Sequence, residues 1–263
     1  MSQKNTTKES SVTDNTENMP LTRWQAFKKE WGGFLILLFC LFCFRSVIAD
    51  WNAVPTGSMK PTIYEGDRIW VNKLSYGLRI PFTNIRVATL GQPKRGEIVV
   101  FPEPISGKRY IKRAIGIPGD LIEVKDNLVY LNGKRLDYRE YTPEELKTFA
   151  DVPGSSLDEN NDLFFWLEES IGDTTHPIQI LYPQYNRDTR YRYYRAIEVP
   201  KGKIFVMGDN RDQSQDSRRI GLVDTNTLIG KATRVAWSHN YDNYYWFRGK
   251  RFFKPIDELS ETD

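Results

Sequence analysis

One apolar run near the N-terminus dominates the hydrophobic pattern of this chain. Residues 31–44, WGGFLILLFCLFCF, contain no charged side chain, whereas residues 1–20 are rich in Ser, Thr, Asn and Glu. As a helix the run would rise only about 21 Å, but extension through Arg45 to Ala49 gives about 28 Å, close to the roughly 30 Å hydrocarbon core of a bilayer. Arg45 can reach water because long basic side chains extend along a helix toward the interface. We therefore predict a disordered tail over 1–20 and a transmembrane anchor helix over 21–50.

The apolar run could also belong to a cleaved signal peptide. About thirty polar residues precede it, however, and Arg45 stands where small neutral residues would mark a cleavage site. These features favour an uncleaved anchor. Arg23, Lys28 and Lys29 flank its start, so the positive-inside rule places the N-terminus in the cytoplasm and everything after Asp50 on the outer side.

Beyond the anchor, short runs rich in β-branched residues alternate with Gly, Pro and Asn, a pattern typical of strands. No repeated strand–helix alternation indicates a parallel doubly wound sheet. The Asn132-Gly133 pair favours a type I′ hairpin turn leading into 134–136. The predicted strands are 68–72, 97–101, 121–124, 128–131, 203–207 and 228–237. We expect a mainly β protein, an antiparallel-sheet domain tethered by one N-terminal transmembrane helix.

Residues 137–200 differ from their surroundings because they are polar, rich in Tyr and loop-like. Thr142, Pro143 and Glu145 predict the start of one short helix, with an N-cap, a first-turn proline and a capping-box acid. We interpret 137–200 as an insertion between the two parts of a β core, 51–136 and 201–263. Near the C-terminus, the aromatic cluster 244–247 could lie at a membrane interface, although packing against the sheet is favoured.

Composition and charge exclude several classes of protein. The 263 residues carry a net charge of +3 and 13% aromatic residues, which excludes a wholly disordered chain. With no nucleic-acid-binding motif, this balance gives no reason to expect nucleic acid as a partner. Cys40 and Cys43 both lie in the apolar run, so the rest of the chain has no disulfide framework and no thiolate metal ligand. His176 and His239 cannot form a His-rich metal site, and we expect neither a metal nor a cofactor.

Two segments could supply a nucleophile and a base. Gly57 and Pro61 bracket Ser58 in a turn that can expose its hydroxyl, although a purely structural turn explains this segment as well. A serine needs a base to act as a nucleophile. Lys112 lies in an apolar segment, and burial would lower its pKa by about 2–4 units and make it a competent base near pH 8. Alternatively, the segment is an edge strand in which Lys112 and Arg113 are solvated.

A third segment, 208–218, follows an apolar strand and is dense in polar side chains. Ser214 could orient a neutral lysine, because a hydroxyl both donates and accepts a hydrogen bond. Asp216 and Arg218 could pair and brace the loop. A calcium loop is the competing interpretation, but the acidic residues lack the EF-hand spacing and Arg211 opposes dense cation binding.

These segments together resemble bacterial type I signal peptidases. The resemblance covers 57–62, 66–73, 110–120 and 208–218, in the order of the family. It implies a serine–lysine dyad with Ser58 as nucleophile and Lys112 as general base. It further implies that the Ser58 amide and the Thr56 hydroxyl donate to the oxyanion, and that the shallow pockets for substrate positions −1 and −3 are lined by Val54 and Ile111. Ser214 matches the lysine-orienting serine of the family, and the bracing pair matches Asp216 and Arg218.

The resemblance also predicts the partners of the chain. They are the signal peptides of preproteins emerging from the export machinery, and membrane lipid, with the protein acting as a monomer in the bacterial inner membrane. This chain departs from some relatives in having one clear membrane segment and no cysteine pair in its outer domain. A membrane-anchored assembly or adaptor domain without catalysis remains an alternative, as does a peptidase dedicated to pilin or conjugation-protein maturation.

Overall fold

The structure is a computed structural model that describes residues 22–83, 85–103, 107–150, 163–186, 188–240 and 246–259. The predicted tail, 1–20, lies outside the described residues. The chain divides into two units, residues 1–43 and 44–263. The second unit carries all the strands of the described residues and all the predicted site residues, so its internal arrangement decides what the site can do.

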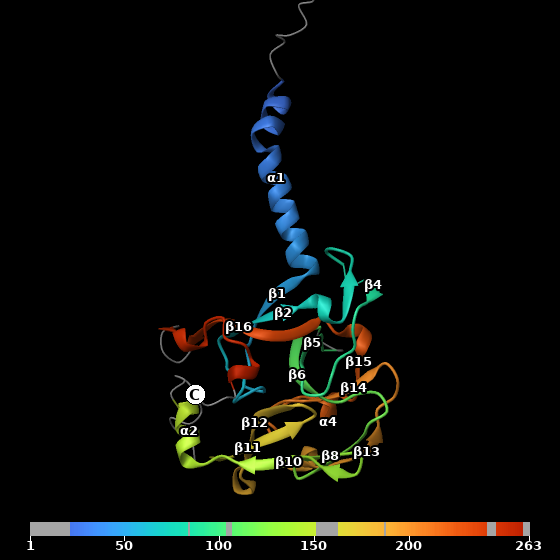
Figure 1. Cartoon of the computed structure of the whole chain (residues 1–263), viewed down its shortest axis with the longest axis vertical. Helices are drawn as coiled ribbons and strands as arrows, with labels where there is room; N and C mark the ends of the chain where they lie inside the picture. The colour runs from blue at the N-terminus through green and yellow to red at the C-terminus, as the bar shows by residue number, and fades with distance from the viewer. Residues whose placement is uncertain are drawn as a thin grey trace, which may run out of the picture. The chain divides into compact units, whose positions relative to one another are not determined.

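Among the described residues, one helix is long and apolar enough to cross a membrane, α1 (Arg23–Val47) (Figure 1). It ends earlier than the predicted anchor because Ala49 already pairs with Asn72 in a strand ladder. Arg45 in its last turn forms an ion pair with Asp50 at 3.1 Å, and its guanidinium lies 4.0 Å from the centre of the Trp51 ring. The expected end at residue 50 is therefore wrong, since the chain from Ala49 onward forms a paired strand instead.

An antiparallel sheet forms the core of the second unit, as the alternating pattern predicts (Figure 1). Its strand order is β1-β2-β16-β5-β6-β14-β15, and β17 pairs with the C-terminal end of β16. The six strands expected from the sequence coincide with structural strands to within a few residues. The strands of this sheet are β1 (Ala49–Ala53), β2 (Asp67–Asn72), β5 (Ile98–Pro102), β6 (Arg109–Gly116), β14 (Lys203–Met207), β15 (Val223–Asp224), β16 (Gly230–Asn240) and β17 (Trp246–Phe247).

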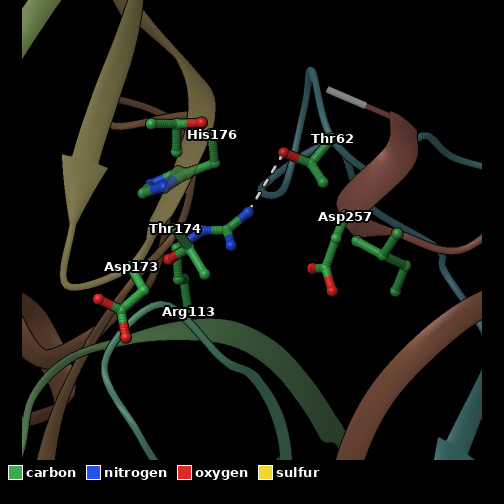
Figure 2. Close-up of a pocket in the computed structure, with 8 residues that line it drawn as sticks. Thr62, Arg113, Asp173, Thr174, His176 and Asp257 are labelled. Atoms are coloured by element: carbon green, nitrogen blue, oxygen red, sulfur yellow. Dashed lines mark hydrogen bonds between the residues drawn. The ribbon is translucent and has the colours of Figure 1, made fainter. Parts of the chain in front are cut away.

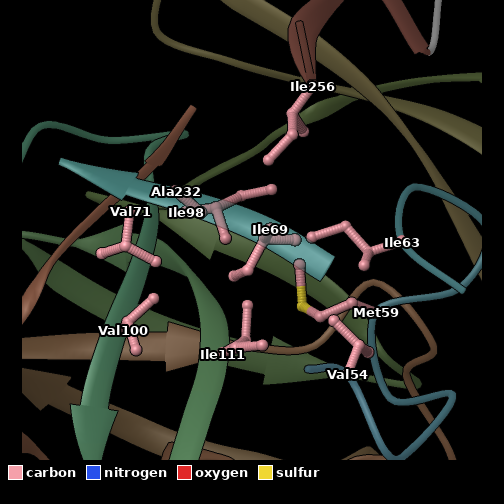
Figure 3. Packing of buried hydrophobic residues seen from close by; sticks show 10 residues of the cluster. All are labelled: Val54, Met59, Ile63, Ile69, Val71, Ile98, Val100, Ile111, Ala232 and Ile256. Carbon is pink, nitrogen blue, oxygen red and sulfur yellow. The ribbon is translucent and has the colours of Figure 1, made fainter. Parts of the chain in front are cut away.

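One face of this sheet packs on an apolar cluster that also holds the loop between β1 and β2 (Figure 3). On β2, Ile69 and Val71 are fully buried while their sequence neighbours are half-exposed, as expected where one face of a strand is buried. Met59, in the loop, is buried among them. The cluster contains Val54, Met59, Ile63, Ile69, Val71, Ile98, Val100, Ile111, Ala232 and Ile256. The loop that carries Ser58 and the strand that carries Lys112 thus share one hydrophobic core.

Three smaller sheets accompany the central sheet in the part of the chain that the structure describes. The predicted hairpin turn is confirmed, because Asn132 and Gly133 both adopt positive φ, 53° and 83°. Thr142 and Glu145 exchange backbone–side-chain hydrogen bonds at the start of α2, which confirms the capping box. The additional strands are β3 (Gly77–Arg79) with β4 (Arg86–Thr89); β13 (Tyr194–Glu198), β7 (Leu121–Lys125), β8 (Leu128–Leu131) and β9 (Lys134–Arg135); and β10 (Asp137–Glu140), β11 (Phe164–Ile171) and β12 (Thr174–Leu181).

The remaining elements are short helices. They are α2 (Pro143–Ala150), α4 (Ser217–Ile220), η1 (Lys73–Ser75), η3 (Pro183–Tyr185), η4 (Arg190–Arg192), η5 (Thr225–Thr227), η6 (Gly249–Arg251) and η7 (Asp257–Leu259). Tyr244 and Tyr245 lie outside the described residues, whereas Trp246 and Phe247 in β17 are exposed. For Trp246, which is 73% exposed, the expectation that the aromatic cluster packs against the sheet is wrong, whereas the Phe247 ring makes an edge contact with His239 of β16.

The loop-like appearance of residues 137–200 is also misleading, since β10, β11 and β12 form a three-stranded antiparallel sheet there. Glu169 and His176 are buried on these strands, so charged positions interrupt the apolar pattern that normally reveals a strand. Glu169 forms a buried ion pair with Arg211 at 2.6 Å. Glu169 and His176 therefore serve as internal partners, whereas other polar residues of the segment, such as Arg139, are exposed.

This sheet holds the 208–218 loop. The backbone N–H of Gln179 in β12 donates to the carbonyl of Asp209 at 3.0 Å, and the Gln179 carbonyl accepts the backbone N–H of Arg211 at 3.0 Å. The Glu169–Arg211 ion pair adds a charged connection between β11 and the same loop, and neither side chain has any exposed surface. The loop is thereby fixed by the inserted sheet on one side, which leaves its other side for the site described below.

Replacing Glu169 by Ala should lower the free energy of unfolding by about 3–5 kcal/mol, because the buried charge of Arg211 loses its partner. The matched control is Glu168→Ala, which removes an exposed partner of Arg139 and should cost less than about 1 kcal/mol. Denaturant unfolding of the full chain, followed by tryptophan fluorescence, measures both. Equal losses for the two variants would contradict a buried charged brace.

Candidate active site

Ser58 lies in a tight loop between β1 and β2. The Lys60 amide donates to Gly57 O and the Ile63 amide donates to Met59 O, which folds the loop back on itself. A Cβ on Gly57 would lie 2.6 Å from Oε1 of Glu65, so a larger residue there would require the Glu65 side chain to move. Because Met59 is anchored in the core, the loop presents Ser58 at a fixed place with its side chain only partly buried.

Lys112 lies in β6, opposite Val99 of β5, and its side chain reaches Ser58. Its Nζ is 2.7 Å from Ser58 Oγ and donates to Ile111 O at 2.9 Å. Only 4% of Lys112 is exposed. Burial lowers the pKa of Lys112 from 10.5 to about 8, although the nearby carboxylates of Asp216 and Asp209 oppose this shift. A solvated edge strand is therefore excluded, because β6 is central and its lysine is buried.

Sequence reasoning missed the role of Arg113, the next residue on β6. It is also buried, and it forms an ion pair with Asp209 at 2.7 Å. Thr62 donates its hydroxyl to the same carboxylate at 2.6 Å. Adjacent basic residues in an otherwise apolar strand were the available signal, since each needs a partner once the strand is buried. Arg113 thus ties the strand of Lys112 to the 208–218 loop.

The 208–218 loop contacts the backbone of the Ser58 segment. The Asn210 amide donates to Ser58 O at 3.2 Å, and its Nδ2 donates to Gly57 O at 3.2 Å. A Cβ on Gly208 would lie 2.4 Å from Ser58 O and equally close to Ser214 Oγ. The glycine therefore permits a close approach of the two backbones. From the sequence, Asn210 was considered only as a candidate calcium ligand, and Gly208 was given no role of its own.

Asp216 and Arg218 form the expected bracing pair, with the guanidinium bound by both carboxylate oxygens at 2.8 and 2.9 Å. Asp216 also accepts the Gly208 amide at 3.1 Å. Asp209, Asp212 and Asp216 each pair with an arginine, namely Arg113, Arg192 and Arg218. Ion pairs to arginine rather than a bound calcium ion therefore account for the acidic residues of this loop.

Ser214 is buried beside Gly208, and its hydroxyl is near enough to Asp216 to help lower the pKa of that carboxyl. The amine of Lys112 is instead bonded to Ser58 and Ile111. The interpretation of Ser214 as the residue that orients the lysine thus stays a prediction. Its position next to Gly208 keeps it in the immediate neighbourhood of the Ser58 backbone.

An open groove of about 480 Å³ runs past the serine and the lysine. Val54 and Ile111 lie on its wall, and Thr56 is exposed in it two residues before Ser58. The roles of Thr56 in binding an oxyanion and of Val54 and Ile111 in binding substrate side chains stay predictions. The groove is lined by Val54, Pro55, Thr56, Gly57, Ser58, Met59, Lys108, Arg109, Tyr110, Ile111, Lys112, Gln213 and Gln215. Ser58 and Lys112 thus both lie on the wall of this groove.

A second, smaller cavity of about 190 Å³ lies where Arg113 meets His176 and Thr62 (Figure 2). The guanidinium points toward the Thr62 hydroxyl, at 3.4 Å. Burial and the charge of Arg113 lower the pKa of His176, whose Nε2 is 3.2 Å from Glu169. His176 is thus a neutral buried histidine beside the Glu169–Arg211 ion pair. Neither Ser58 nor Lys112 lines this cavity.

Comparison with known proteins places the chain in a family. The model of the family "Signal peptidase, peptidase S26" matches residues 28–237. A signal peptidase I of Buchnera aphidicola subsp. Schizaphis graminum is 35% identical over 81% of this chain and 76% of its own length. One from Rickettsia massiliae is also 35% identical, over 87% of each chain.

A solved signal peptidase I from Enterococcus faecalis V583 is 28% identical and covers 54% of this chain and 97% of its own, with a TM-score of 0.31. That superposition is too poor to bear on the fold, so the assignment depends on the sequence matches. A family model that spans most of the chain, together with relatives aligned over most of both lengths, is decisive. The chain belongs to the signal peptidase family, peptidase S26.

Proposed function

We propose that this chain is a membrane-bound serine endopeptidase that removes N-terminal signal peptides from exported preproteins. It cuts after small residues at −1 and −3, with Ser58 as nucleophile and Lys112 as general base. The observation that supports this most directly is the 2.7 Å distance from the buried Lys112 amine to the Ser58 hydroxyl. Two histidines, one buried away from the serine, make a lysine base the simpler source of activation.

The geometry suits proton transfer in both directions. The Ile111 carbonyl holds one N–H of the Lys112 amine, so a neutral amine can direct its lone pair at the Ser58 hydroxyl. The base takes the hydroxyl proton as Oγ attacks the scissile carbonyl, and it then protonates the leaving amine. The same amine activates water for hydrolysis of the acyl-enzyme. The Ser58 amide and the Thr56 hydroxyl are the proposed oxyanion donors, and each such donor is typically worth about 10²–10³ in rate.

The proposal also places the site at the outer surface of the bacterial inner membrane. Helix α1 would span the bilayer with its N-terminus in the cytoplasm, and its last residue, Val47, precedes Ser58 by a segment that reaches at most roughly 40 Å when extended. Signal peptides end just outside the bilayer, so a nucleophile on such a tether stays within reach of the cleavage site.

Ser58→Ala and Lys112→Ala should each lower kcat/KM for a preprotein with an Ala-x-Ala site by about 10⁴-fold or more, because the members of a dyad act as a unit. Lys112→Arg should be equally inactive, since a guanidinium stays protonated and cannot act as a base. The assay uses purified full-length protein, with circular dichroism to show that each variant is folded. Activity near that of the wild type in any folded variant refutes the dyad.

The rate should rise with pH through a value near 8. The neutral amine is the active form, so below the lowered pKa of Lys112, about 8, kcat/KM falls tenfold per pH unit. Above that pKa the profile levels off. Initial rates on a peptide substrate between pH 6 and 10 measure this dependence, and a flat profile would show that Lys112 is not the titrating base.

Ile111→Ala should widen the groove and raise kcat/KM for substrates with Val or Leu at −1 or −3, by about tenfold or more relative to Ala-x-Ala. Val100→Ala is the matched control, because Val100 belongs to the same core cluster and does not line the groove. Both changes lower stability, but only the first should change selectivity. A shift of equal size in both would attribute the effect to general loosening of the core.

A further inference from the structure

The hairpin of β3 and β4 exposes a concentrated set of apolar side chains. Phe82 at its tip is 65% exposed, and Ile85 and Val87 are each more than 60% exposed. Exposed apolar residues that gather in one place, unlike single ones, indicate a surface that is covered by something else. The members of this set, which we call the hairpin patch, are Leu78, Ile80, Phe82, Ile85, Val87 and Leu90.

The hairpin is attached to the last turn of α1. The Phe82 amide donates to Ser46 Oγ at 2.7 Å. Lys73, which precedes β3, donates its amine to the carbonyls of Ser46 and Arg45 at 3.0 and 3.3 Å. Residues 44–47 belong to the same unit as the hairpin. The patch therefore lies where the candidate membrane span ends.

A cavity of about 210 Å³ lies at the foot of the hairpin, and it is rich in positive charge. Its walls include the cations Lys73, Arg79 and Arg109, the hydroxyl residues Ser46 and Thr83, and the apolar residues Phe82 and Ile229. We call it the basic cavity. It places anion-binding groups directly beside an apolar tip, an arrangement that matches the two chemical parts of a lipid.

The positive charge of the basic cavity is only partly balanced. Asp50 is shared among Arg109 at 2.9 Å, Arg45 at 3.1 Å and Lys73 at 3.5 Å. Arg79 is held by a backbone carbonyl, that of Leu228, rather than by a carboxylate. Burial lowers the pKa of Lys73, and Arg109 and Arg45 lower it further against the opposing effect of Asp50. One carboxylate among four cations leaves a site that favours an anion.

We propose that the hairpin patch and the basic cavity form a binding site for an anionic phospholipid. The apolar side chains enter the acyl-chain region, while the cavity binds the lipid phosphate through Lys73, Arg79 and Arg109. A guanidinium group can donate two parallel hydrogen bonds to two oxygens of one phosphate, and basic residues near a bilayer are attracted to anionic headgroups. The inference rests on the proposed function only in that it takes α1 to span the membrane.

The site has a consequence for the peptidase groove. Arg109 lines both the basic cavity and the groove that contains Ser58. It also bonds to Asp50 and Asn52 of β1, the strand that leads from α1 to the Ser58 loop. A bound phosphate therefore fixes the height of the groove relative to the membrane surface. A protein partner is less well matched, because the patch adjoins the end of a membrane helix.

The cavity is tested by lipid retention. Full-length protein carrying Ser58→Ala, purified in detergent, is titrated with phosphatidylglycerol or phosphatidylcholine, and bound lipid is measured by native mass spectrometry. The parent should bind one phosphatidylglycerol in preference to phosphatidylcholine. Arg79→Gln should weaken that binding about fivefold, whereas the control Arg195→Gln, at an exposed arginine of β13, should not. Equal binding by the Arg79→Gln and Arg195→Gln proteins overturns the proposal.

A second arm distinguishes the lipid from free phosphate. Inorganic phosphate is added at constant ionic strength, with chloride as the reference. Phosphatidylglycerol binding that persists in millimolar phosphate supports a lipid site, whereas full displacement by phosphate but not by chloride assigns the cavity to a soluble anion. Because the lipid-binding measurements use the Ser58→Ala protein, their result does not depend on whether the chain is a peptidase.

The hairpin patch is tested by photocrosslinking in vesicles that contain phosphatidylglycerol. A photoreactive phenylalanine analogue replaces Phe82, or Tyr193 as a control with similar exposure, 65% against 61%. Crosslinks to lipid should form from position 82 at several times the yield from position 193. Equal yields, or crosslinks from position 82 mainly to a protein, overturn the assignment of this surface to the bilayer.

Discussion

The chemistry proposed for this protein depends on one contact, between an amine kept from water and a hydroxyl at the edge of a groove. In the proposed dyad, Lys112 could serve as a base only because a central strand buries it, and Ser58 could serve as a nucleophile only because its loop is anchored in the same core. Sheet packing therefore sets the protonation state as well as the distance. An exposed lysine at the same separation would stay charged at neutral pH and could not accept the proton.

The other elements of the fold hold this contact in place. The 208–218 loop bonds to the backbone of Ser58 through Asn210, and Arg113 joins the loop to the strand of the lysine. Behind the loop, the inserted sheet adds the Glu169–Arg211 pair. Because these charges are buried, separating a pair would leave an uncompensated charge inside the protein at a large cost in free energy, so the partners stay together. Residues far apart in the chain are thus tied into one support for Ser58.

Much of this arrangement could be predicted from the sequence, for identifiable reasons. Strands such as β2 and β5 carry apolar runs, and Asn132-Gly133 is a strong local turn signal, so both were predicted correctly. The inserted sheet was missed because burying Glu169 depends on Arg211, a partner distant in sequence. The end of α1 was misplaced because pairing with β2, not local propensity, decides it. Long-range partners therefore account for most of what the sequence alone did not reveal.

The grip on residue 58 acts through its main chain. Asn210 contacts the carbonyl oxygens of Ser58 and Gly57, and Gly208 approaches the same backbone, while none of these contacts uses the hydroxyl. The backbone position of residue 58 therefore does not depend on which side chain it carries. A cysteine at position 58 would therefore place its thiol where the hydroxyl now lies. An alanine there would leave the groove intact, so that an uncleaved peptide could be bound for structure determination.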